Sequence, residues 1–60
     1  MNLNGMNYDL TDKLVNIVLM NDRDYSGKVK TIGDDYICIC TGDMDVFVAL
    51  NYIGAIIVVL

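Results

Sequence analysis

The chain has 60 residues, of which 55% are hydrophobic, and it carries eight Asp against four Lys and Arg. This length allows one small domain, residues 1–60, and excludes a two-domain enzyme. His, Glu, Gln, Trp and Pro do not occur, which excludes imidazole-based catalysis and His-containing zinc sites. The net charge of −4 opposes long-range attraction to phosphate backbones.

The apolar content is high for so short a chain. A domain of this size buries only about 60% of the surface that its unfolded chain exposes, so we expect the protein to associate with copies of itself. The longest unbroken apolar run, residues 55–60, is far shorter than the roughly 18 residues of a membrane span. No secretory signal pattern opens the chain, and we expect a cytoplasmic protein without membrane contact.

The first half of the chain predicts a polar arm and two strands. Residues 1–12 form an arm, and residues 8–13 could form at most a turn or two of helix. Residues 14–20 are an apolar strand that ends at the turn-forming Asn21 and Asp22. Residues 24–32 alternate in part and predict a half-exposed strand, with Ser26, Lys28 and Lys30 on one face.

The second half predicts three more strands. Gly33, Asp34 and Asp35 form a turn before a strand at residues 36–41, and a second turn precedes a strand at residues 45–50. A corner at residues 51–53 leads into the last strand, residues 55–60. This last strand lacks alternation, which indicates burial on both faces. A neighbouring copy of the chain would cover the second face of this strand.

Five short strands separated by regular turns predict an all-β fold, a small, strongly bent five-stranded barrel of the SH3-like or OB-like kind. Gly27 lies in the middle of the second strand. A glycine inside a strand is typical of a sharp bend or of a close approach by another backbone. Gly27 therefore marks the expected barrel corner.

Two segments of this pattern resemble the Sm-like proteins, including bacterial Hfq. Residues 14–37 are similar to the first Sm motif: an apolar strand, an Asn- or Asp-containing turn, a strand with the central Gly27, an acidic turn and another apolar strand. Residues 46–56 look like the short second motif, in which two strands meet at a tight corner. The resemblance covers roughly residues 13–58 and implies an Sm-like barrel.

The resemblance also implies an assembly and a ligand. Sm-like subunits form rings of usually six or seven copies, in which the fourth strand of one subunit pairs with the fifth of the next. They bind single-stranded RNA around the pore, which by position makes Tyr36 the base-stacking residue, Asp34 its acidic neighbour and Asn51 a residue of the second-motif corner. The chain departs from the family in having Ile37 where an Asn is usual and no Lys, Arg or His after Lys30.

The remaining candidate residues have a structural and a functional interpretation each. Lys28 and Lys30, with Arg23, form the only basic cluster, which is either a solvated strand face or a phosphate track. Cys38 and Cys40 are two residues apart, and a disulfide between them would close too small a loop to stabilise the fold, so we expect reduced thiols. They could be two ligands of a metal site, but a structural zinc needs four, and we interpret them as small packed strand residues. The Asp pairs are turn residues or ligands of a hard cation, and the tyrosines are packing residues or stacking surfaces for bases.

The sequence thus predicts no enzyme, no cofactor and no metal site. It leaves two functions open. One is a homo-oligomeric Sm-like module that binds single-stranded RNA or nucleotides by stacking in pockets between subunits. The other is an acidic oligomeric module, or an inhibitor, that binds a protein partner.

Overall fold

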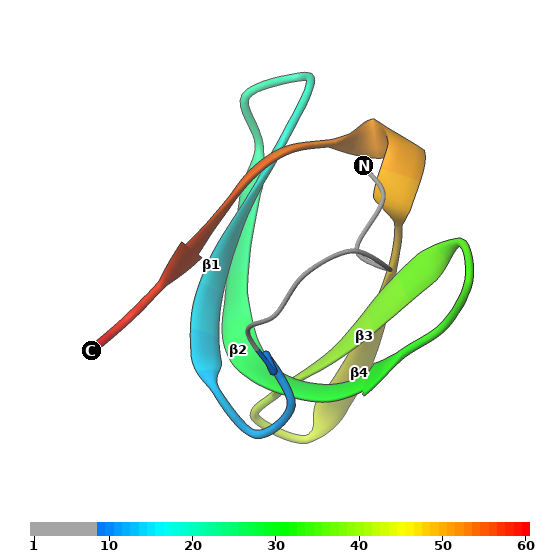
Figure 1. The fold of residues 1–60 in the computed structure, drawn as a ribbon. Helices are drawn as coiled ribbons and strands as arrows, with labels where there is room; N and C mark the ends of the chain where they lie inside the picture. Colours follow the sequence, from blue (N-terminus) through cyan, green and yellow to red (C-terminus); the bar gives the residue numbers. More distant parts are fainter. Residues whose placement is uncertain (1–8) are drawn as a thin grey trace.

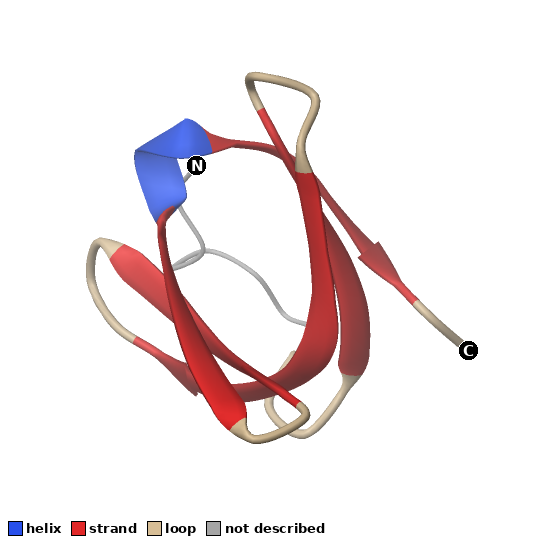
Figure 2. Cartoon of the chain, turned by 180° about the vertical axis from the view of Figure 1, so that it is seen from behind, coloured by secondary structure: helices blue, strands red, loops and turns tan. Residues whose placement is uncertain are grey.

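The structure, a computed structural model, describes residues 9–60 (Figures 1 and 2). Along the chain the elements are β1 (Leu14–Leu19), β2 (Asp24–Ile32), β3 (Tyr36–Thr41), β4 (Met44–Ala49), the short 3₁₀ helix η1 (Leu50–Tyr52) and β5 (Ile53–Val58). The predicted all-β class is confirmed. Within residues 9–60 no helix is long and apolar enough to cross a membrane.

Four of the predicted strands lie within one residue of the observed ones. The fifth begins at Ile53, two residues earlier than predicted, because η1 already ends at Tyr52. The predicted helical turn at residues 8–13 lies partly outside the described residues. Its described part, residues 9–13, is a reverse turn: Lys13 N–H donates to the Leu10 carbonyl (3.0 Å), and Asp12 has a left-handed φ of 65° that a helix cannot contain.

The five strands form one antiparallel sheet in the order β4-β3-β2-β1-β5. β4 and β5 are therefore its two edge strands. The ladder shifts register between Val18 and Leu19 opposite β5, and between Val29 and Thr31 opposite β3. Such bulges bend strands, and the sheet curls around a common interior (Figure 1). The sheet itself is open, and its closure into a barrel stays a prediction.

The core lies inside the curled sheet and follows the alternation of the strands. In β1, Val15, Ile17 and Leu19 are buried while the residues between them are more exposed. The other buried members of the core are Leu10, Val29, Ile37, Ile39, Val48, Leu50 and Ile53. Because burying one aliphatic side chain contributes about 1.5–3 kcal/mol, this single cluster is the main source of stability.

The backbone of β3 lies close to Gly27 in β2. A Cβ added at this position would be 2.6 Å from the carbonyl oxygen of Cys40 and 3.1 Å from its carbonyl carbon. No side chain fits there unless the backbone of β3 moves. The close approach predicted at Gly27 is confirmed.

Candidate nucleic-acid interface

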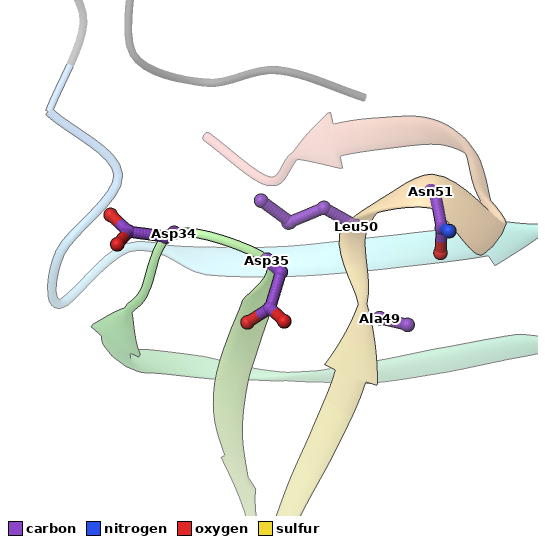
Figure 3. Close-up of a pocket in the computed structure, with 5 residues that line it drawn as sticks. All are labelled: Asp34, Asp35, Ala49, Leu50 and Asn51. Atoms are coloured by element: carbon purple, nitrogen blue, oxygen red, sulfur yellow. The ribbon is translucent and has the colours of Figure 1, made fainter.

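Two of the predicted site residues, Asp34 and Asn51, line the same surface pocket, which has a volume of about 390 Å³ (Figure 3). Asp34 belongs to the turn between β2 and β3, and Asn51 belongs to η1. The N–H of Leu50 donates to the carbonyl of Asp35 (2.9 Å) and so joins the turn to the end of β4. The pocket is lined by Asp34, Asp35, Ala49, Leu50 and Asn51.

The polar side chains of this pocket do not all face the same way. Figure 3 shows the carboxylate of Asp35 and the amide of Asn51 pointing in the same direction from opposite sides of the chain at Ala49, whereas Asp34 points away from both. Leu50 is buried and belongs to the core. The residues that line the pocket therefore include two carboxylates and one carboxamide, and only the carboxylate of Asp35 points the same way as that carboxamide.

Tyr36 is half-buried and does not line the pocket, although it pairs in the ladder with Ala49, which does. Its ring contacts the ring of Phe47 with the centroids 5.7 Å apart and the planes tilted by 50°. This separation is typical of aromatic packing. Tyr36 and the exposed Phe47 thus form an aromatic surface next to the pocket.

Lys28 and Lys30 lie elsewhere on the sheet, beside a second pocket of about 240 Å³ that Asp12, Val29 and Cys40 also line. The ammonium of Lys30 donates to Asp45 Oδ2 at 2.9 Å, and this exposed ion pair links β2 to β4. The hydrogen bond and the charge of Asp45 raise the pKa of Lys30 above its ordinary value. Within residues 9–60, the ammonium of Lys28 has no such contact with a carboxylate.

The charges around the candidate site are mainly negative. The five residues of the larger pocket include two carboxylates and neither Lys nor Arg. All four cationic side chains of the chain fall within residues 9–60, and the two in β2, Lys28 and Lys30, line the other pocket. A phosphate group would therefore gain little electrostatic attraction in the larger pocket.

The two cysteines are free thiols, with Cys38 buried and Cys40 exposed. Within the part of the chain that the structure describes, no three Cys or Asp side chains are grouped so that they could hold a metal ion. The chemistry that the site offers is hydrogen bonding and stacking.

Sequence reasoning did not include Asp35, Ala49 and Leu50 among the site residues. The sequence places Asp34 and Asp35 in one turn, but it does not predict which of the two carboxylates faces the pocket. Phe47 was also missed as the aromatic neighbour of Tyr36, since the two residues meet only through the pairing of β3 with β4.

Comparison with known protein families found no matching family model, and comparison with curated proteins found no match.

Proposed function

We propose that the protein is a non-enzymatic, homo-oligomeric Sm-like module that binds single-stranded RNA by stacking bases beside the Asp35–Asn51 pocket. The observation that carries this proposal is the strand order of the sheet. In this order β4 and β5 are the two edge strands. They are the strands that the Sm-like resemblance assigns to contacts between subunits.

The side chains of the two edges support their pairing. On β4, Val46 is half-buried and Phe47 is 67% exposed; on β5, Val58 is half-buried and Ile57 is 52% exposed. Both strands therefore carry an inward apolar row that is incompletely covered and an outward apolar residue. A β4–β5 contact between copies would bury the rest of both apolar rows. It would also hydrogen-bond the outward N–H and C=O groups of the two edge strands.

The contact joins two different strands, so it is heterologous and repeats from copy to copy. Heterologous contacts produce rings when the rotation closes and filaments when it does not. The resemblance to Sm-like proteins favours a closed ring of six or seven copies. It also favours closure of each curled sheet into the compact barrel of that family.

The arrangement of the site supports single-stranded RNA as the ligand. The larger pocket has a volume within the range of small-molecule sites, and the aromatic surface of Tyr36 and Phe47 lies beside it. Bases of a single strand are free to stack on aromatic rings, and each stacked base contributes about 1–3 kcal/mol. Stacking does not require the cations that this chain lacks.

A second function, binding of a protein partner by an acidic oligomer, is favoured by one observation. Lys30, one of only four cationic side chains, is already paired with Asp45. The surface therefore has less positive charge for phosphates than the composition alone indicates. A basic protein surface is the complementary partner for such a molecule.

Light scattering combined with a titration of fluorescently labelled single-stranded RNA tests the proposal. We expect an oligomer at micromolar concentration and saturable binding at low salt. A monomer would contradict the assembly. An oligomer that binds no strand from a mixed-sequence RNA pool would reject the RNA function and favour the protein partner.

A further inference from the structure

The larger pocket contains side chains with different hydrogen-bonding groups, carboxylates and a carboxamide. An ionised carboxylate only accepts hydrogen bonds, whereas a carboxamide both donates and accepts. Asp35 and Asn51 contribute one of each, and their side chains point in the same direction (Figure 3). A ligand that fits both must present donors toward Asp35, whereas Asn51 can match either an acceptor or a donor on the ligand.

We infer that this pocket selects guanine among the nucleobases, an inference that rests on the proposed RNA-binding function. The Watson–Crick edge of guanine presents two adjacent N–H donors, at N1 and at the 2-amino group, next to the acceptor O6. The donors match the two oxygens of the Asp35 carboxylate in a bidentate, charge-assisted contact. The amide of Asn51 donates to O6.

The other bases match the pocket less well. Uracil has a single N–H between two carbonyl oxygens, and a carboxylate repels both of them. Adenine and cytosine present an amino group beside a ring nitrogen that only accepts, so either base can give Asp35 one hydrogen bond but not two. A good bidentate contact to a base contributes about 5- to 150-fold in discrimination.

The phosphate chain does not compete for this pocket. The residues that line it include two carboxylates and no cation, and like charges repel. Asp34 points away from Asp35 and Asn51 (Figure 3), and its charge keeps a phosphate out without contacting the base. The pocket is therefore assigned to the base edge, with the sugar and phosphate outside it.

Nucleosides test this inference without an RNA chain. Guanosine, inosine and uridine are titrated into the intact oligomer, and the backbone amide resonances of Asp35, Leu50 and Asn51 are followed by NMR. We expect guanosine to bind at least about fivefold more tightly than uridine. Inosine, which lacks the 2-amino group, should lie between them.

The variant Asp35→Asn supplies the decisive comparison, because a carboxamide can pair with uracil. It should remove the preference for guanosine over uridine. Asp43→Asn is the matched control: it makes the same change of charge in the turn between β3 and β4, away from the pocket, and should keep the preference. An unchanged preference in Asp35→Asn, or uridine binding as tight as that of guanosine, would overturn the inference.

Short A-rich RNA strands that differ only in a central G or U separate this inference from the proposed function. A preference for the G strand that Asp35→Asn removes supports both. RNA binding without a base preference leaves the RNA function and overturns the guanine pocket. Selective binding of guanosine without binding of either strand overturns the RNA function and assigns the pocket to free guanine nucleosides.

Discussion

The ring of Tyr36 lies directly against the backbone of Gly33. A Cβ built at Gly33 would be 2.6 Å from Cδ1 of the ring and would overlap Cε1. The two residues are also joined by the main chain, where Gly33 N–H donates to the Tyr36 carbonyl at 2.9 Å. Gly33 does not adopt a positive φ, so the contact with the ring, and not the backbone, is what excludes a side chain.

Gly33→Ala should therefore displace the Tyr36 ring while the turn keeps its conformation. We expect a loss of stability of about 1 kcal/mol, because a side chain can move aside, and a clear loss of RNA affinity, because the stacking surface moves. Thermal unfolding and RNA titration measure the two effects. Gly54→Ala is the control, since its Cβ would be 3.6 Å from the nearest atom, an ordinary contact. Equal RNA affinity in both variants would remove Tyr36 from the binding surface.

Gly27→Val should destabilise the fold more than Gly33→Ala. At Gly27 the obstacle is the carbonyl of Cys40 in the neighbouring strand, and this backbone cannot rotate away as a ring can. Overpacking of this kind costs about 1–3 kcal/mol or more. Chemical denaturation of Gly27→Val beside Gly54→Ala measures the difference. A stability equal to that of the unsubstituted protein would falsify the close packing of β2 on β3.

The sequence predicted the middle strands better than the last one, and the reason is physical. The turns before and after β3 contain glycine or acidic residues that break apolar runs, so its ends were visible. The start of β5 lies inside the nearly unbroken apolar stretch that begins at Ile53, where alternation gives no boundary. The corner is set by long-range pairing: Met20 N–H donates to the carbonyl of Tyr52 at 3.0 Å.

The candidate site was predictable only in part for a similar reason. The acidic turn before β3 and the corner after β4 could be predicted from local sequence, and the fold brings Asp34 and Asn51 to one pocket. The direction in which each carboxylate points depends on the tertiary structure. The ion pair of Lys30 with Asp45 depends on the register of β2, β3 and β4. The two residues are 15 positions apart, so no local sequence pattern predicts their contact.

Tyr36→Ala should weaken binding of short single-stranded RNA by about 1–3 kcal/mol for each base that it stacks. Tyr36→Phe keeps the ring and its packing on Phe47 and should retain most of the affinity. Fluorescence anisotropy at several salt concentrations gives both the affinity and its salt dependence. We expect a shallow salt slope, because few phosphates are neutralised. A steep slope with an unaffected Tyr36→Ala variant would point to a phosphate-binding surface instead.

Lys28→Glu should reduce RNA affinity more than Lys30→Glu. The ammonium of Lys30 forms an ion pair with Asp45, so a phosphate would have to compete with that carboxylate, whereas Lys28 has no such ion pair within residues 9–60. Each effect should be smaller than that of Tyr36→Ala and additive to it, since the two pockets are lined by different residues. RNA titration of the two single variants and of each combined with Tyr36→Ala measures this. Equal affinity in all lysine variants would make this strand face a solvated surface only.

Ile57→Asp should break the assembly and leave the protomer folded. Ile57 is 52% exposed on the edge strand β5, so a carboxylate there costs little in an isolated copy but would be buried without a partner in a β4–β5 contact. Val58→Asp is less informative, because Val58 packs on the core and its loss would unfold the protomer as well.

Met20→Asp is the matched control, with an exposed apolar side chain in the turn after β1. Light scattering should give a monomer for Ile57→Asp and an unchanged oligomer for Met20→Asp, with circular dichroism reporting the same strand content in both. An oligomer that survives Ile57→Asp would place the contact between copies away from β5.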